Sequence, residues 1–486
     1  MQADVAQAET DPSRPAYHFR PPAGYHNDPN GLICHAGFYH LFYQFHPFTG
    51  GRGKGDRIFW GHARSSDLVH WEPLPLAIWP SIEAGELRCA SGSTIVGPEG
   101  TPLIFYTSLG DRASQAAAPD QWAAVGDPDL VAWDKHRDNP VLTARVHGGL
   151  RISQWRDPFV FREGGDWYML IGGRVHRPER ERGCIAIYRA ADGGLMDWRF
   201  AGILYEWPDA EVTSIECPNL FRLGDRWLLL FSYHPPATQV AWLSGWFDPV
   251  ACTFSSQRQG RIDLSPMGTY AHQGMRDERG RVILFGWVRG AGWYPGGGRG
   301  WSGCMSLPQV VSLDAAGCLV RRPAEELTEL RGRHHNQQPV LLRDEVRSVA
   351  GISGDRLEIV AELRPREEAA CGLVVRRSSG GERGVVIRFA AGRLQVTGAD
   401  PAGIFTGGNG SSAGGDFDVP FDPGGEEMVL QLRLFLDGCV LELFVNERAS
   451  LTRAIYAAPG DLGVAAFAEG EVEVERLEAW EMMGVW

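Results

Sequence analysis

The sequence predicts an all-β protein in which a five-bladed β-propeller is followed by a C-terminal β-sandwich. Three observations support this prediction. Five aromatic-rich hairpins recur at a nearly constant spacing, the 486 residues include 61 Gly and 31 Pro, and alternating strands continue beyond the last hairpin. Abundant Gly and Pro indicate many turns, and strands repeated at a fixed period are typical of propellers.

Each hairpin consists of an apolar strand, a turn and a second apolar strand. The hairpins cover residues 32–45, 93–106, 159–171, 220–233 and 275–287. Counted from the residue that opens each first strand, the spacings are 61, 66, 60 and 56 residues. This period leaves room for two further strands per unit, which gives a four-stranded blade. A large β-sandwich whose hairpins repeat by chance is the alternative.

The repeats divide the chain into four parts. We expect a flexible N-terminus over 1–16, the propeller over 17–320, a helical linker over 321–338 and the sandwich over 339–486. Pro323 at a favourable first helical position, followed by acidic residues, predicts the linker helix. In the sandwich, a long hairpin over 429–445 turns at Asp437, and a Gly/Ser-rich loop covers 406–415.

Charge and composition argue against several classes of protein. The formal net charge is −13 and no Lys/Arg cluster forms a basic stripe, so we expect no nucleic-acid partner. No stretch approaches 18 apolar residues, and the first 15 residues lack the charge and apolar run of a signal peptide. We therefore expect a cytoplasmic protein without a membrane partner, although a secreted form that has lost its leader would look the same. The sequence leaves the oligomeric state open.

Three acidic residues occupy equivalent positions just before innermost strands: Asp28 in blade one, Asp157 in blade three and Glu216 in blade four. Each is followed by Pro one or two residues later, and Ser91 and His272 lie at the same level in blades two and five. Because innermost strands surround one axis, we expect these residues to meet at one mouth of the central channel. Taken singly, each acid also fits a turn, a surface ion pair or a strand cap.

Carboxyl groups crowded together cannot all remain ionised, so one should have a raised pKa and donate a proton. We expect this group to be Glu216, which lies between the apolar Ile215 and Cys217, while Asp28 and Asp157 stay anionic among polar neighbours. One acid and one nucleophile make the pair used by retaining glycosidases, about 5–5.5 Å apart. Aromatic residues of the same region are candidates for stacking on sugars, and each also fits a blade core: Phe42, Tyr43, Trp60, Tyr270 and Trp301.

An ordered set of motifs spans nearly the whole chain. It consists of Asn27-Asp28-Pro29-Asn30-Gly31, His40-Leu41-Phe42-Tyr43-Gln44, Trp60-Gly61-His62-Ala63, Ser66-Asp67-Leu68-Val69-His70-Trp71, Ser91-Gly92-Ser93, Arg156-Asp157-Pro158, Glu216-Cys217-Pro218, Leu434-Phe435-Leu436-Asp437 and Glu442-Leu443-Phe444-Val445-Asn446. With this set, the chain resembles glycoside hydrolase family 32, the β-fructofuranosidases.

The resemblance implies a five-bladed propeller joined to a sandwich and a retaining exo-glycosidase acting on sucrose or short fructo-oligosaccharides. Asp28 would attack the anomeric carbon of a terminal fructosyl unit, and Glu216 would protonate the leaving oxygen and then activate water. Asp157 and Arg156 would bind fructose hydroxyls and stabilise the transition state. The residues that fall where the family binds the fructose ring are Asn27, Gln44, Ser91 and Tyr270. Neither a metal nor an organic cofactor is needed for this chemistry.

The chain also departs from the family pattern, and we expect the departures to border the pocket and change the aglycone preference. They are His26, Ala90, Ile215, Asn219 and a Gly-rich stretch over 50–55 in place of a Trp-Gly pair. The Gly-rich stretch is either a phosphate cradle or a flexible surface loop. A transfructosylase, an arabinan-type glycosidase on a similar propeller and a catalytically silent fructan-binding protein are the alternative functions.

Overall fold

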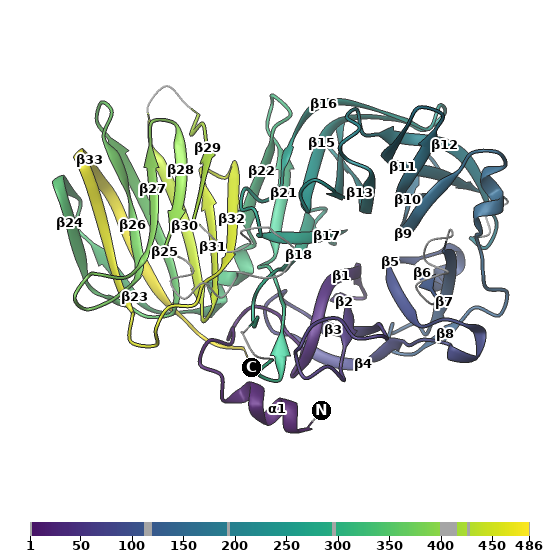
Figure 1. The fold of residues 1–486 in the computed structure, drawn as a ribbon, viewed down its shortest axis with the longest axis horizontal. Coiled ribbons are helices and arrows are strands. Elements are labelled where there is room, and N and C mark those ends of the chain that lie inside the picture. Colours follow the sequence, from purple (N-terminus) through teal and green to yellow (C-terminus); the bar gives the residue numbers. More distant parts are fainter. Residues whose placement is uncertain are drawn as a thin grey trace.

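The computed structural model describes residues 2–110, 119–191, 195–293, 298–398, 416–424 and 428–485. Within these ranges the chain forms five separate sheets around one axis and a sixth, larger sheet beside them (Figure 1). The predicted all-β fold, a five-bladed propeller followed by a sandwich, is confirmed. The Gly/Ser-rich loop over 406–415 lies outside the described residues.

Each blade is an antiparallel sheet whose first strand lies innermost. Blade one contains β1 (Gly24–His35), β2 (Phe38–His46), β3 (Phe59–Ser65) and β4 (Glu72–Ile78). Blade two contains β5 (Arg88–Val96), β6 (Pro102–Leu109), β7 (Asp120–Gly126) and β8 (Trp133–Lys135). Blade three contains β9 (Ile152–Glu163), β10 (Asp166–Arg177), β11 (Arg180–Ala190) and β12 (Trp198–Glu206).

Blades four and five complete the ring. Blade four contains β13 (Ser214–Leu223), β14 (Arg226–His234), β15 (Gln239–Asp248) and β16 (Thr253–Arg261), and blade five contains β17 (Thr269–Arg276), β18 (Val282–Val288), β21 (Gln309–Leu313) and β22 (Leu319–Pro323). Two short strands lie between β18 and β21: β19 (Trp301–Ser302) and β20 (Cys304–Met305). Since β19 pairs in parallel with β1 and β20 pairs with β18, this segment joins the last blade to the first.

A β-bulge interrupts every innermost strand at the same level. The register shifts lie at His26–Pro29, Cys89–Gly92, Arg156–Phe159, Glu216–Asn219 and Tyr270–Gln273. At these bulges Asp157, Cys217 and Ala271 have φ of 67°, 48° and 52°, in the left-handed region. A bulge redirects the side chains of a strand, and it also accommodates Pro, which has no N–H for the ladder. The prolines that follow the three acids are therefore explained by the bulges.

Below the bulges, polar side chains connect the innermost strands of different blades. The Asn219 Nδ2 group donates to the carbonyl of His272 (3.0 Å), and Gln273 Nε2 donates to the carbonyl of Gly92 (2.8 Å). Ser93 Oγ accepts a hydrogen bond from the backbone N–H of Val160 (3.0 Å). These bonds tie blades that share no sheet ladder, so the channel wall holds the bulges in place.

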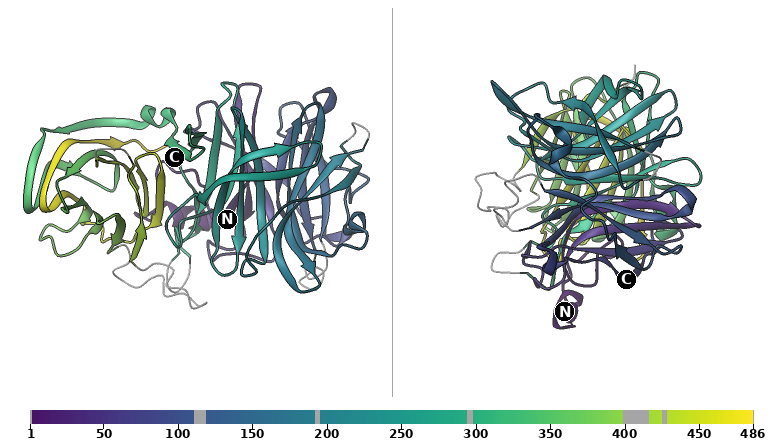
Figure 2. Two further views of the ribbon diagram at one scale, coloured as in Figure 1. Left: turned by 90° about the horizontal axis from the view of Figure 1, so that it is seen from above. Right: turned by 90° about the vertical axis from the view of Figure 1, so that its right-hand side faces the viewer.

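The second domain is one curled sheet of eleven strands within the described ranges. The strands are β23 (Arg331–Gln337), β24 (Val340–Ser353), β25 (Arg356–Pro365), β26 (Ala370–Arg377), β27 (Val385–Ala390), β28 (Arg393–Thr397), β29 (Phe417–Pro420), β30 (Leu430–Asp437), β31 (Val440–Val445), β32 (Ala449–Ala454) and β33 (Gly463–Met482). The 20-residue β33 pairs with β26 along its first part and with β25 along its second. The sheet therefore folds over itself around an apolar core, as the left view of Figure 2 shows.

The connection between the domains is shorter than the predicted linker over 321–338. Strand β22 continues in blade five as far as Pro323, a 3-10 helix covers Glu325–Leu330, and β23 begins at Arg331. Leu327 and Leu330 of the 3-10 helix are buried, which holds it between the two domains. The remaining 3-10 helices are Ile82–Ala84, Pro98–Gly100 and Ala144–His147.

The N-terminal segment, expected to be flexible, contains helix α1 (Gln2–Glu9) and packs on the propeller. Asp11 is buried, and its Oδ2 accepts a hydrogen bond from Trp301 Nε1 (2.9 Å). The polar composition of this segment suggested mobility, but its partner lies 290 residues away in the sequence. No helix within the described ranges is long and apolar enough to cross a membrane.

Residues 16–18 then fasten the propeller to the sandwich. The Asp437 carboxylate, at the turn of the predicted hairpin, accepts hydrogen bonds from the backbone N–H groups of Ala16, Tyr17 and His18 (2.6, 2.8 and 2.8 Å). The His18 ring bridges Asp437 Oδ2 (2.8 Å) and Glu442 Oε1 (3.1 Å), and all three side chains are buried. This contact is therefore a charged, dry junction between the domains.

Candidate active site

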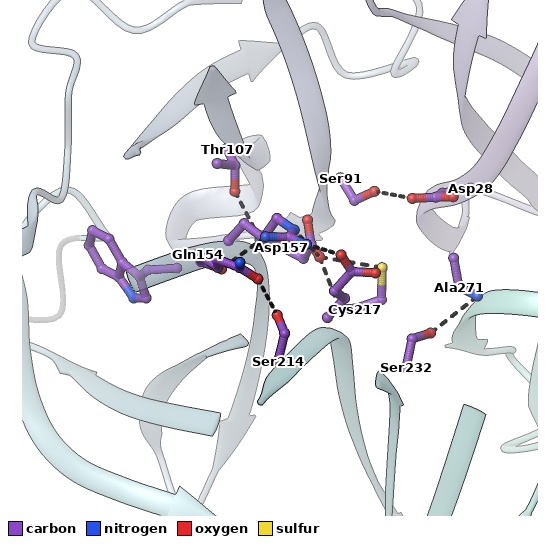
Figure 3. A network of polar contacts seen from close by, with 12 residues as sticks. Asp28, Ser91, Thr107, Gln154, Asp157, Ser214, Cys217, Ser232 and Ala271 are labelled. Carbon is purple, nitrogen blue, oxygen red and sulfur yellow. Dashed lines mark hydrogen bonds and ion pairs between the residues drawn. The ribbon is translucent and has the colours of Figure 1, made fainter. Parts of the chain in front are cut away.

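A cavity of about 490 Å³ opens at the mouth of the channel where the bulges lie. Its polar and aromatic lining includes Asp28, Gln44, Lys54, Arg88, Gln154, Arg156, Asp157, Glu216, His234, Tyr270 and Trp287. The structure thus brings the three predicted acids together, although they come from blades one, three and four. Figure 3 shows two of them, Asp28 beside Ser91 and Asp157 beside Thr107 and Cys217.

Asp28 is held by donors from blades one and two. Its Oδ1 accepts from Asn27 Nδ2 (2.9 Å), and its Oδ2 accepts from Ser91 Oγ (3.0 Å) and Gln44 Nε2 (3.2 Å). Gln44 also donates to Ser91 (2.6 Å), and Asn27 donates to Gln44 Oε1 (2.9 Å). This network fixes the carboxylate plane while the half-buried side chain of Asp28 still lines the cavity.

Asp157 is held by blades two and four. Its backbone N–H donates to Thr107 Oγ1 (2.8 Å), and its Oδ2 accepts from the backbone N–H of Cys217 (3.0 Å) and lies 3.5 Å from the Cys217 thiol (Figure 3). The guanidinium of Arg156 approaches the same oxygen, with Nε at 3.9 Å. The left-handed backbone at Asp157 and Cys217 therefore places a carboxylate beside the donors of the next blade.

Glu216 has polar partners on both carboxylate oxygens. Oε1 contacts the Arg156 guanidinium and lies 3.1 Å from His234 Nε2, and Oε2 accepts a hydrogen bond from Tyr270 Oη (2.6 Å). The apolar surroundings predicted for Glu216 are therefore not found. Its neighbour Ile215 is fully buried in the blade core, because adjacent residues of a strand point to opposite faces.

Burial, rather than the sequence neighbours, controls the pKa of the two aspartates. Desolvation raises the pKa of Asp28, and the charge of Lys54 and the hydrogen bond from Asn27 oppose this rise. Desolvation also raises the pKa of Asp157, and Arg156 and the Cys217 N–H oppose it. The prediction that polar neighbours keep these two groups anionic took no account of this desolvation, which favours their neutral forms.

Of the predicted substrate-binding residues, Gln44, Arg156 and Tyr270 line the cavity, whereas Asn27, Ser91 and Trp60 do not. Asn27 and Ser91 are fully buried and act through their bonds to Asp28. The buried Trp60 donates from Nε1 to the carbonyl of Ala90 (2.9 Å), so it belongs to the blade core. The other aromatic candidates for stacking that lie in the core are Phe42, Tyr43 and Trp301.

The prediction that all departures from the family pattern border the cavity is wrong. Ala90 lines it, whereas Ile215, Asn219 and His26 are fully buried elsewhere. Asn219 connects blades four and five below the bulges. Lys54 of the Gly-rich stretch is exposed and reaches the cavity rim.

Sequence reasoning missed several residues of the site. Trp287 lines the cavity and pairs in register with Tyr270, and His234 and Gln154 line it beside Glu216. Thr107 supports Asp157 from β6, the second strand of blade two. For His234 and Trp287 a signal existed, because both lie at the end of the second strand of a hairpin whose first strand carries a site residue.

A propeller channel mouth that presents one anchored aspartate, a glutamate from another blade and further hydroxyl-binding groups defines a glycoside hydrolase type of site. In the part of the chain that the structure describes, no group of three or more His, Cys, Asp or Glu side chains is arranged to hold a metal ion. The arrangement suits chemistry in which carboxyl groups transfer protons and form a covalent bond.

Comparisons with known proteins identify the family. Residues 18–323 match the Glycosyl hydrolases family 32 N-terminal domain, and residues 326–481 match the Glycosyl hydrolases family 32 C terminal domain. The chain therefore belongs to glycoside hydrolase family 32, as its motifs predicted.

Relatives and solved structures agree over nearly the full length. The chain is 28% identical to the sucrose-6-phosphate hydrolase of Escherichia coli, over 95% of this chain and 93% of that one. It is 30% identical to the raffinose invertase of Escherichia coli, over 91% and 89% of the two chains. Fructan 1-exohydrolase IIa of Cichorium intybus has the same fold, with a TM-score of 0.83, 24% identity and coverage of 97% and 98%.

Proposed function

We propose that the protein is an exo-acting, retaining β-fructofuranosidase that hydrolyses terminal β-D-fructofuranosides such as sucrose and short fructo-oligosaccharides. The observation that carries this proposal is the pairing in one cavity of Asp28, anchored by three donors, with Glu216, held by groups from blades three, four and five. Retaining glycosidases need such a fixed nucleophile and a separate acid/base.

In the first step, the ionised Asp28 carboxylate attacks the anomeric carbon of the fructosyl unit while protonated Glu216 gives its proton to the leaving oxygen. The glycosidic bond breaks, the aglycone leaves and a fructosyl ester forms on Asp28. In the second step, the Glu216 carboxylate takes a proton from water as the water oxygen attacks the same carbon. The ester bond breaks, fructose is released and Glu216 is protonated again.

The remaining cavity residues act on the charge that develops at the fructosyl ring. Asp157 accepts a hydrogen bond from the Cys217 N–H, and its position beside Arg156 suits it to bind ring hydroxyls and stabilise an oxocarbenium-like transition state. Asn27, Gln44 and Ser91 keep Asp28 oriented for attack. Tyr270 and Trp287 supply aromatic faces beside the ring.

The relatives support a fructosyl substrate. Sucrose 6-phosphate, raffinose and fructans, which their names specify, all carry a terminal or branching fructofuranosyl unit, whereas the remainder of each molecule differs. The common unit therefore belongs beside the three acids, and the variable part faces the rim where Ala90 lies. This rim is the region in which we expect the substrate preference to be determined.

Product analysis tests the proposal. Purified protein is incubated in parallel with sucrose, an inulin-type trisaccharide, inulin and levan, with the Asp28→Ala variant as the blank. Free fructose that the blank does not produce is the expected result, and longer oligosaccharides at high sucrose would instead indicate fructosyl transfer. Methanol as acceptor reports the stereochemistry: methyl β-D-fructofuranoside is expected, and the α-anomer would refute retention.

Hydrolysis of a 6-phosphorylated sucrose is a second candidate, favoured by cationic residues at the cavity. Lys54, from the Gly-rich stretch, and Arg88 both line it, and neither forms an ion pair with a carboxylate in the described residues. A phosphate on the leaving sugar would find these charges at the rim. The ratio of kcat/KM for sucrose 6-phosphate and sucrose, measured for the wild type and Lys54→Ala, distinguishes the two substrates.

A further inference from the structure

His234 contacts the proposed acid/base from a neighbouring strand. It is the last residue of β14, its backbone pairs with Ser214 two residues before Glu216, and its Nε2 lies 3.1 Å from Glu216 Oε1. The His234 side chain is 31% exposed and lines the cavity, whereas the Glu216 side chain is 16% exposed. The imidazole is thus the more exposed of these two groups, which meet in the cavity.

We infer that His234 is a positioning residue of this glycosidase, which keeps the Glu216 carboxyl aimed at the leaving oxygen in both of its protonation states and borders the subsite of the leaving group. The inference rests on the proposed function, because it assigns a partner to the acid/base of that reaction. It adds a role for a residue that no motif in the sequence identified.

The partners of Glu216 differ in whether they can donate or accept a hydrogen bond. Arg156 donates only, so its contact with Oε1 is best when Glu216 is ionised. A neutral imidazole carries one donor and one acceptor nitrogen, so Nε2 of one tautomer donates to the carboxylate and Nε2 of the other accepts from the carboxylic acid. His234 therefore offers a hydrogen bond at Oε1 before and after the proton leaves.

The charges around His234 keep the imidazole neutral. Burial, and then the charges of Arg156 and Arg174, lower its pKa to about 4, although Asp157 opposes this shift. The carboxyl group in direct contact with the ring is that of Glu216. At neutral pH the ring is thus free to take either tautomer, which is the property that the positioning role requires.

The position of His234 places it at the subsite of the leaving group. Glu216 gives its proton to the oxygen that joins fructose to the leaving group, so an exposed group in contact with Glu216 is adjacent to that leaving group. Gln154 lines the same side, and its Oε1 accepts a hydrogen bond from Ser214 Oγ (2.6 Å). His234 and Gln154 therefore form the wall that the aglycone approaches.

The test compares His234→Leu, which removes the hydrogen bond, with His234→Gln, whose amide restores a polar group at a similar reach. Two substrates are used: sucrose, whose leaving group needs protonation, and p-nitrophenyl β-D-fructofuranoside, whose leaving group does not. We expect the leucine variant to lose about tenfold to a hundredfold in kcat/KM on sucrose, mostly in kcat, and about threefold or less on the nitrophenyl substrate. The glutamine variant should recover most of the sucrose activity.

The matched control is His70→Gln, since His70 is exposed and its ring contacts Asp67 (2.8 Å) away from the cavity. Thermal unfolding of every variant identifies a general loss of structure. An equal loss on both substrates in the two His234 variants, or no loss on either, would overturn the positioning role. A wild-type protein that releases fructose from neither substrate would instead refute the proposed function, so the two failures are distinguishable.

Discussion

Buried carboxylates occur in two regions of this protein, and their surroundings differ. At the sandwich, Asp437 accepts three backbone N–H groups and the ring of His18, and Glu358 is paired with both Arg331 and Arg433. Both acids are fully buried. In the cavity, by contrast, Asp28 accepts its hydrogen bonds from the neutral side chains of Asn27, Gln44 and Ser91, and one side of the site is open to substrate.

The difference shows how one residue type serves two purposes. An ionised carboxylate in a protein interior is stable only when its hydrogen-bonding capacity is filled, which Asp437 and Glu358 achieve. In the cavity, burial raises the pKa of Asp28 and Asp157, because desolvation is not fully offset. The capacity left over is available to a substrate, so reactivity and incomplete neutralisation are consequences of the same arrangement.

The largest effect is expected for the loss of an acid in the cavity. Asp28→Ala should lower fructose release by roughly 10⁴-fold or more, because no nucleophile remains to form the ester. The urea midpoint should stay the same or rise, since burial opposes the charged form of this group. Activity above about a tenth of wild type would show that another group is the nucleophile.

The second prediction concerns the loss of a buried acid in the sandwich. Asp437→Ala leaves three buried N–H groups and the His18 ring without their partner, and we expect it to cost about 3–5 kcal/mol in urea unfolding. At low temperature the folded variant should keep its kcat. Asp418→Ala is the control, because Asp418 pairs with Arg393 on the surface and its loss should leave the urea midpoint nearly unchanged. Similar losses for both variants would contradict the distinction.

The stability of the junction between the domains should depend on pH through His18. Burial by itself lowers the pKa of His18, but hydrogen bonds to Asp437 and Glu442 raise it to about 9. Because the folded value exceeds the unfolded one, the stability from His18 is complete below about pH 6.5 and is lost as the pH rises through 9. Urea midpoints between pH 6 and 9.5 should therefore fall in the wild type and fall less in His18→Gln. Parallel curves would mean that His18 is neutral in the fold.

The sequence was sufficient to predict the blades and the meeting of the acids for a definite physical reason. A bulge at a fixed level of every innermost strand requires a residue that tolerates a missing ladder hydrogen bond, and Pro after an acid meets this requirement. The motif and the architecture are thus one signal. The same signal located Asp28, Asp157 and Glu216.

What the sequence did not predict depends on which way a bulge turns each side chain. Ile215 suggested an apolar environment for Glu216, but the strand sends Ile215 into the core and Glu216 toward Arg156. Trp60 contacts a residue 30 positions away in the sequence, and His18 contacts one 419 positions away. Local sequence patterns do not encode such contacts. Side-chain direction and long-range partners therefore needed the coordinates.

The smallest expected effect concerns the rim of the cavity. The charge of Lys54 opposes the rise that burial causes in the pKa of Asp28, so Lys54→Ala should raise that pKa further. Asp28 must be ionised to attack, and the acidic limb of the kcat/KM profile should therefore move to higher pH. Because Lys54 is exposed, the displacement should shrink in high salt.

Arg52→Ala is the matched control for this charge, since Arg52 is exposed on the same Gly-rich stretch but does not line the cavity. It should leave the acidic limb in place. A limb that moves equally in both variants would indicate a general effect of net charge, and one that moves in neither would mean that Asp28 depends on its hydrogen bonds alone. In the expected case, the nucleophile is tuned by a distant, screened cation, whereas the acids of the sandwich are neutralised by direct contact.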